Sequence, residues 1–129
     1  MREIKFRAWD KVLKKYFYTG SLDNGDIMVM HLDGRIEISD DDTYSPKDFV
    51  IEQYTGLPDK NGIDIYEGDI ISPCCISASV THCVVIFVNG MFCKKQIGSE
   101  LFEEELFLHL HYSEVIGNIH ENPELMEAI

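Results

Sequence analysis

Turns follow one another so closely in this chain that only short segments of regular structure fit between them. The densest example is residues 52–71, EQYTGLPDKNGIDIYEGDII, where four glycine or proline residues and six acidic or basic side chains occupy twenty positions. The run Pro58-Asp59-Lys60-Asn61-Gly62 consists of residues that pre-set or tolerate turn geometry. In Glu67-Gly68-Asp69 the glycine tolerates a positive φ. We therefore expect two turns joining three short strands, the first of which ends at Thr55-Gly56.

Two other dipeptides predict β-hairpins. Asn89-Gly90 separates two runs, and the first of them, Val84–Val88, is apolar throughout, as in a central strand. Asp33-Gly34 separates DIMVMHL from RIEIS, and a two-residue turn there pairs Leu32 with Arg35. That register places on one face Ile27, Val29, His31, Ile36 and Ile38. We assign structural roles in turns to five glycines, namely Gly34, Gly56, Gly62, Gly68 and Gly90.

The crowded stretch has no arrangement typical of catalysis. Residues 52–71 contain no histidine, serine or cysteine, so no nucleophile is paired with a base there. The carboxylates of Asp59, Asp64, Glu67 and Asp69 fall beside the predicted turns, where we expect them to stay hydrated. A general acid or base needs a perturbed pKa in a cleft, and the sequence shows no sign of one. We therefore predict a protein that is not an enzyme and that uses no cofactor.

Charge is distributed unevenly along the chain. The formal net charge is −12, yet residues 1–15 contain six basic and two acidic side chains, which leaves +4 there and −16 in the remainder. Such acidity disfavours direct binding to nucleic acid. Alternation in EIKFRAWD predicts a strand with one buried face, and it sets Lys5 and Arg7 beside Trp9. These three residues form a candidate interaction surface; alternatively, Trp9 covers the core while the two cations extend into water.

The C-terminal third carries one ambiguous segment. In SELFEEELFLHLHY the alternating leucines favour a strand, whereas the density of Leu and Glu and the lack of β-branched residues favour a helix. We expect one short helix near 100–111. On a strand His109 and His111 would share a face and could chelate a metal, but on a helix they diverge. Asn122-Pro123 then predicts a C-terminal helical turn.

Cysteine and hydropathy patterns indicate the compartment. Cys74, Cys75, Cys83 and Cys93 have no C-x-x-C or zinc-ribbon spacing, so we expect reduced structural thiols and no metal site. No run of apolar residues is long enough to span a bilayer, and the first residues lack the apolar core of a signal peptide. We therefore expect no membrane association and a location in the cytoplasm.

Three segments, IKFRAWD, QYTGLPDKNGIDIYEGDII and SEVIGNIHENPEL, resemble the signatures of the YopX family, small proteins found mostly in bacteriophages and prophages. The resemblance implies a mainly β fold with an SH3-like barrel, and it brings no catalytic or metal-binding residues because the family's biochemical role is not established. Short strands with glycine-rich turns independently favour a barrel or sandwich. The prediction is thus one mainly β domain over residues 1–129, a small SH3-like barrel built from short strands and hairpins.

Two functional hypotheses follow. The first is a phage or prophage accessory protein that acts as a non-enzymatic protein-interaction module, with an unknown protein partner and with weak homo-oligomers formed between the basic N-terminal segment and the acidic remainder. The second is an acidic decoy that imitates nucleic acid and occupies a host DNA-binding enzyme. Competition by DNA separates the two hypotheses, because only a decoy's partners are nucleic-acid enzymes that DNA displaces.

Overall fold

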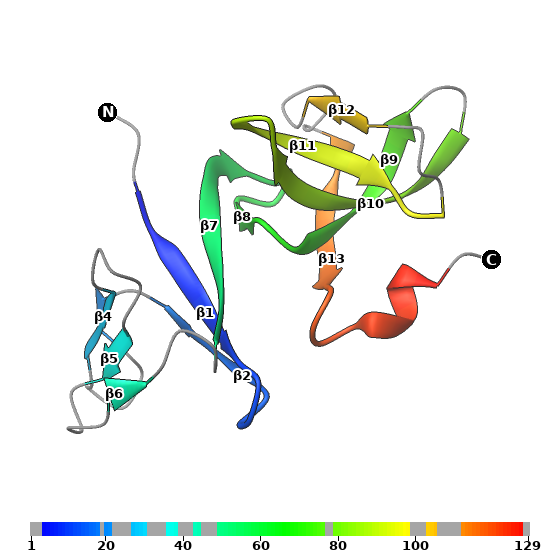
Figure 1. Ribbon diagram of the computed structural model, residues 1–129. Coiled ribbons are helices and arrows are strands. Elements are labelled where there is room, and N and C mark those ends of the chain that lie inside the picture. The colour runs from blue at the N-terminus through cyan, green and yellow to red at the C-terminus, as the bar shows by residue number, and fades with distance from the viewer. Residues whose placement is uncertain are drawn as a thin grey trace. The chain divides into compact units, whose positions relative to one another are not determined.

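The computed structural model describes residues 4–18, 20–21, 27–30, 36–38, 43–44, 49–76, 79–98, 103–105 and 112–127, and these residues are mainly β-strand (Figure 1). The chain divides into two compact units, the first ending at Gln53 and the second beginning at Tyr54, so the boundary lies within strand β7. Each unit is described by itself. The expectation of one domain over residues 1–129 stays a prediction.

The first unit holds three neighbouring antiparallel strands, β1 (Phe6–Asp10), β2 (Lys15–Tyr18) and the first half of β7 (Phe49–Pro58). The predicted N-terminal strand is confirmed, but the expectation of a single buried face is wrong, because Arg7, Ala8, Trp9 and Asp10 are all buried. The reason is that β1 lies between β2 and β7, and its polar side chains have partners on neighbouring segments of the chain.

A small antiparallel sheet in the same unit has the order β3 (Gly20–Ser21), β4 (Ile27–Met30), β5 (Ile36–Ile38) and β6 (Thr43–Tyr44). The hairpin predicted between β4 and β5 forms, but its predicted register is wrong by one residue. Met28 lies opposite Ile38 and Val29 opposite Glu37. A shift of one residue exchanges the two faces, so the predicted set of residues on one face is wrong. The predicted turn at Gly34, and His31, lie outside the described residues.

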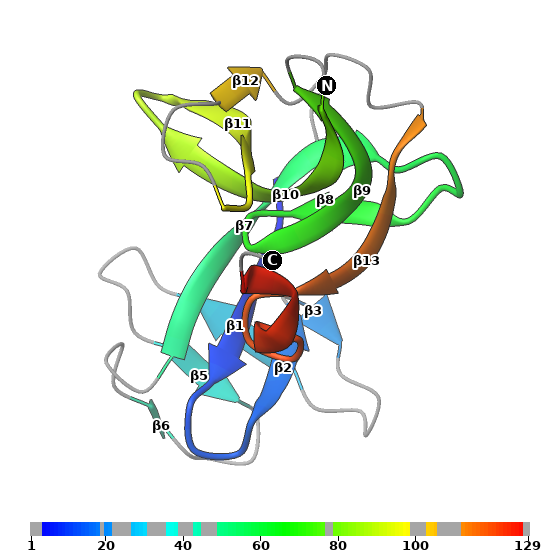
Figure 2. The ribbon, with the colours of Figure 1, turned by 90° about the vertical axis from the view of Figure 1, so that its right-hand side faces the viewer.

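The second unit is dominated by an antiparallel sheet of order β12-β11-β10-β9-β13. Its strands are β9 (Asp69–Ile76), β10 (Ser79–Val88), β11 (Met91–Gln96), β12 (Glu103–Glu105) and β13 (Glu114–Asn118). Figure 2 shows β9 and β10 bending, so that this sheet curls. The apolar run in β10 lies in the central strand, as predicted. Asn89 and Gly90, with φ of 52° and 79°, form the predicted two-residue turn that sets Val88 opposite Met91.

The stretch 52–71 forms two turns and three strands, with β8 (Asp64–Tyr66) as the middle strand. The first strand does not end at Thr55-Gly56, however, because β7 continues to Pro58 through an irregularity after Tyr54. Gly56 has a φ of 85°, and the Thr55 hydroxyl donates a 2.7 Å hydrogen bond to the carbonyl oxygen of Ile65 on β8. Gly56 therefore lies in a distortion within a strand rather than in a connecting turn.

The helix predicted near 100–111 is wrong at residues 103–105, which form β12. These three glutamates lie opposite Lys95, Lys94 and Cys93 of β11. Backbone pairing with β11 places these residues in a strand, although local helix propensity favours the alternative. The rest of the segment, including His109 and His111, lies outside the described residues. A 3-10 helix, η3 (Pro123–Met126), occupies the place where a C-terminal helical turn is expected.

The core of the second unit is a cluster of Ile65, Ile71, Cys83 and Val85, against which Leu57, Phe92 and Val115 pack. Cys93 is a buried free thiol, but Cys83 is disulfide-bonded, so the expectation of reduced thiols is wrong at Cys83. The physical reason is that a disulfide depends on which side chains the fold brings together. Sequence spacing alone does not reveal this proximity.

Candidate interaction site

The predicted surface of Lys5, Arg7 and Trp9 falls in a cluster of polar and aromatic side chains on β1, β2 and β7. The Arg7 Nε donates a 2.9 Å hydrogen bond to Glu52 Oε1, and the Tyr16 hydroxyl donates to the same oxygen at 2.9 Å. The Arg7 guanidinium lies 4.2 Å from the centre of the Tyr16 ring. Trp9 meets Tyr16 edge to face, with the ring centres 5.0 Å apart. The cation, the carboxylate and the two rings of this cluster thus interact with one another.

Burial limits what this cluster offers to a partner. Arg7, Trp9 and Glu52 are 4%, 6% and 2% exposed, whereas Lys5 is half-buried. The expectation that Arg7 extends into water is therefore wrong, because its charge is paired with a carboxylate 45 residues away. A buried ion pair needs such hydrogen bonds to offset the loss of hydration. The role of Lys5, Arg7 and Trp9 as an interaction surface stays a prediction, and the burial of two of them weighs against it.

The turn between β1 and β2 presents side chains that the sequence reasoning did not select. Val12 and Leu13 are 76% and 55% exposed. Asp10 Oδ1 accepts hydrogen bonds from the backbone N–H of Val12 at 2.8 Å and of Leu13 at 2.9 Å. The N–H of Lys14, whose φ is 57°, donates to the Asp10 carbonyl oxygen at 2.8 Å. The sequence feature that could have indicated this turn is Asp10, followed by one lysine, two apolar residues and two further lysines.

We call residues 11–15, KVLKK, the basic tip. All five residues are exposed, and three of them are lysines with no acidic residue among them. Lys15 Nζ lies 4.8 Å from the centre of the Phe17 ring, so one of these cations rests on an aromatic face. The hydrogen bonds to Asp10 hold the turn, which gives the tip a defined shape and lets it present two aliphatic side chains between cations.

The carboxylates of stretch 52–71 divide into two kinds. Asp59 and Asp69 are 6% and 2% exposed, so the expectation of hydration is wrong for both. Asp59 Oδ1 accepts from the N–H of Asn61 at 2.8 Å and of Ile63 at 2.9 Å, and Oδ2 accepts from that of Val115 at 2.9 Å. This carboxylate ties the 58–62 turn to β13.

The protonation of Asp59 follows from these contacts. Burial raises the pKa of the carboxyl, but the hydrogen bonds from Val115, Ile63 and Asn61, together with the charge of Lys60, lower the pKa below its ordinary value of 3.8. Asp69 is also used locally, since its Oδ2 accepts from the N–H of Tyr66 at 2.8 Å. Both aspartates thus hold turns.

Gly62 and Gly68 occupy the two turns with φ of 83° and 90°. The N–H of Gly62 donates to the Asp59 carbonyl oxygen at 3.1 Å, and that of Gly68 donates to the Val85 carbonyl oxygen at 2.8 Å. Their backbone conformations favour glycine, as the turn interpretation requires. The effect of replacing them on folding stays a prediction.

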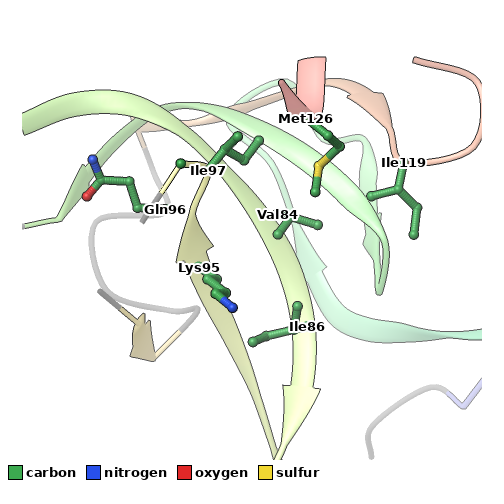
Figure 3. A pocket seen from close by; sticks show the side chains of 8 residues that line it. Val84, Ile86, Lys95, Gln96, Ile97, Ile119 and Met126 are labelled. Atoms are coloured by element: carbon green, nitrogen blue, oxygen red, sulfur yellow. The ribbon is translucent and has the colours of Figure 1, made fainter. Parts of the chain in front are cut away.

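An apolar pocket of about 590 Å³ lies in the second unit (Figure 3). Along β10, Cys83 and Val85 belong to the core, whereas Val84 and Ile86 alternate with them and line the pocket. Figure 3 shows side chains of β10, β11, η3 and the turn after β13 around this space. The lining residues are Val84, Ile86, Lys95, Gln96, Ile97, Gly98, Ile119 and Met126.

One end of the β10–β11 pair has unused hydrogen-bonding capacity. His82 Nδ1 and Gln96 Oε1 are buried and have no hydrogen-bond partner among the described residues. Their strands are joined there by a 3.0 Å hydrogen bond from the N–H of Ile97 to the His82 carbonyl oxygen. No group of three or more His, Cys, Asp or Glu residues that could hold a metal ion occurs in the described part of the chain. The absence of a metal and of a cofactor stays a prediction.

The fold and these surfaces define a small, mainly β protein whose buried polar groups hold turns and strands together. A family model described as YopX protein matches residues 5–127, and the chain therefore belongs to the YopX family. The resemblance noted in the sequence is thereby confirmed.

Solved structures that are similar to this chain include the following two. Protein EF1440 from Enterococcus faecalis has 28% sequence identity and a TM-score of 0.63, with 98% of this chain and 100% of that chain covered. Protein yopX from Bacillus subtilis has 19% identity and a TM-score of 0.61, with 97% of each chain covered, and this likeness shows the fold alone. No functionally curated protein matches the sequence significantly.

Proposed function

We propose that the chain is a phage or prophage accessory protein that acts as a non-enzymatic protein-interaction module in the host cytoplasm. The observation that carries the proposal is the exposure of large apolar side chains at the ends of two hairpins. Val12 and Leu13 are exposed on the β1–β2 turn, and Phe87 and Met91 are 49% and 41% exposed beside the β10–β11 turn.

Both hairpin ends have defined geometry. Hydrogen bonds to Asp10 hold the first, and the Asn89–Gly90 turn sets the second, where the rings of Phe87 and Phe92 lie 4.9 Å apart. Rigid apolar anchors lose little conformational entropy on binding, which favours their use in protein interfaces. We also propose that the strands form the SH3-like barrel that the family resemblance implies. No helix in the described segments is long and apolar enough to span a membrane.

A second candidate function, an acidic decoy of a DNA-binding enzyme, rests on the net charge of −12. Excess negative charge spread over a protein surface can imitate the phosphate backbone in its attraction for a basic groove. The buried positions of Asp59 and Asp69 remove two of these carboxylates from such a surface. The interaction module is therefore the better supported of the two.

Affinity capture from a bacterial host lysate tests both candidates. The bait is the full chain, and the matched variants are Phe87→Ser with Met91→Ser at one hairpin and Ile63→Ser as a control, because Ile63 is 55% exposed and belongs to a different turn. We expect capture of a protein partner that excess duplex DNA does not displace and that only the Phe87/Met91 variant fails to bind. Partners that DNA displaces would favour the decoy. Capture that the Phe87/Met91 variant leaves unchanged would contradict the module.

A further inference from the structure

The basic tip has the character of a ligand rather than of a binding site. Its two aliphatic side chains are among the most exposed hydrophobic residues of the described chain, and three lysines flank them. A partner suited to it needs an apolar depression with carboxylates near its edge. An anionic bilayer would offer carboxylate or phosphate charge without such a depression.

The second unit of the same chain carries a surface with the required chemistry. The pocket has five aliphatic or thioether side chains in its lining, and its volume of about 590 Å³ falls in the range of about 300 to 1,000 Å³ typical of ligand pockets. Room therefore exists for two aliphatic side chains. Lys95 is the cation in the lining, and it lies opposite Glu103 in the β11–β12 register.

Two exposed acidic residues lie close in the chain to one of the residues that line the pocket. Met126, which lines it, belongs to η3, where Glu124 is exposed, and the exposed Glu127 follows directly. Residues 113–127 contain four glutamates and no lysine or arginine. We call Glu124 and Glu127 the acidic rim. The basic tip is thus complementary to the pocket in apolar surface and to the acidic rim in charge.

We propose that the basic tip of one copy docks into the pocket of a second copy, with Val12 and Leu13 in the apolar space and the lysines against the acidic rim. This inference rests on the proposed function as an interaction module and names its partner as another copy of the chain. The contact joins two different surfaces, so it forms a two-fold dimer where two copies make it reciprocally and chains or closed rings where they do not.

The two parts of the contact have different roles. Exposed ion pairs stabilise little and are screened by salt, so the lysines set orientation and speed of encounter. Burial of Val12 and Leu13 supplies most of the affinity. We therefore expect replacement of both by serine to weaken association at least about tenfold, equivalent to about 1.4 kcal/mol. Raising the salt from about 0.1 M to about 1 M shortens the Debye length from about 10 Å to about 3 Å and should weaken association more modestly.

Complementation between two variants tests this arrangement by sedimentation velocity over a concentration series of the full chain. The tip variant is Val12→Ser with Leu13→Ser, and the pocket variant is Met126→Arg. Each is expected to be monomeric alone, because each lacks one side of the contact. Their mixture is expected to form a 1:1 dimer and nothing larger, since a single intact tip meets a single intact pocket. Circular dichroism melts confirm that each variant is folded.

An exchange of charges between the two surfaces provides an independent test of the contact and leaves the pocket lining intact. Lys14→Glu and Glu124→Lys should each associate more weakly than the wild-type chain, and their mixture should recover association. Lys60→Glu is the matched control, since Lys60 is exposed outside both surfaces and its 3.9 Å ion pair with Glu114 is exposed too. Ile63→Ser is the matched control for loss of an exposed aliphatic side chain.

Three results would overturn the inference. The first is a wild-type chain that stays monomeric throughout the concentration series in low salt. The second is an oligomer that ignores the tip, pocket and charge variants. The third is a monomer that binds vesicles of anionic lipid through the basic tip. A monomeric chain that still captures a partner through Phe87 and Met91 would refute this inference and leave the proposed function standing.

Discussion

Replacing Asp59 by asparagine tests whether the polar stretch 52–71 is structural. The carboxylate accepts three backbone N–H groups, two on Oδ1 and that of Val115 on Oδ2. Asparagine keeps one acceptor oxygen, so its amide can serve the two donors of the turn. Its NH2 group then faces the N–H of Val115, which loses its acceptor. Asp59→Asn should therefore loosen the link between the turn and β13.

The magnitude follows from these three bonds. An N–H left without an acceptor costs about 1 to 3 kcal/mol, and changing two charge-assisted bonds into neutral ones costs about 1 kcal/mol each. We expect the free energy of unfolding to fall by about 3 to 5 kcal/mol, a large part of the about 5 to 15 kcal/mol typical of a domain. Urea denaturation at pH 7 measures the change. The control Glu127→Gln removes an exposed carboxylate and should change stability by at most about 0.5 kcal/mol.

The pH dependence gives a second measurement on the same pair of proteins. The pKa of Asp59 is lowered in the folded state, so the stabilisation is complete above the ordinary value of 3.8 and is lost as the pH falls through the folded-state pKa. The difference in stability between wild type and Asp59→Asn should therefore shrink as the pH is lowered from 7 to below 3.8. Coincident urea curves at pH 7, or a difference that does not change with pH, would refute the structural role.

Three other substitutions test separate contacts, each by urea denaturation. Gly117→Ala should cost about 1 to 3 kcal/mol by overpacking, because its Cβ would lie 2.4 Å from Asn122 Oδ1; an unchanged midpoint would contradict this contact. Arg7→Met should lower the free energy of unfolding by about 3 to 5 kcal/mol, because it leaves the Glu52 carboxylate buried without its cation. Adding Glu52→Leu should recover most of this loss. Without such recovery, the lost packing of the arginine side chain rather than the unpaired carboxylate would be the cause of the destabilisation. Gly62→Val should cost about 1 to 3 kcal/mol through backbone strain alone, since nothing lies within 4 Å of the added Cβ, and Gly62→Asn should cost less.

Local chemistry made part of the fold predictable. Asn89 and Gly90 both adopt positive φ, and this pair specifies a two-residue hairpin turn almost regardless of its surroundings. Gly62 and Gly68 behave in the same way, so the division of residues 52–71 into three strands was predictable. The apolar run in β10 indicated a central strand because such a strand is covered on both faces.

The surfaces were less predictable because they depend on partners far away in the sequence. Asp59 meets Val115 across 56 residues, and that contact turns an expected hydrated carboxylate into a buried one. The basic tip was visible only as a charged segment until the Asp10 hydrogen bonds gave it a shape. The pocket joins β10 and β11 to Met126, which no local pattern connects.

The sequence by itself determined the turns at Gly62, Gly68 and Gly90, because a residue's allowed φ and ψ are properties of that residue and its immediate neighbours. Tertiary structure alone decided whether a polar side chain is hydrated or buried, as for Arg7 against Glu52. It also decided that residues 103–105 form a strand, because pairing with β11 outweighs local helix propensity. Burial and strand pairing are properties of two segments at once, so one segment's sequence cannot specify them.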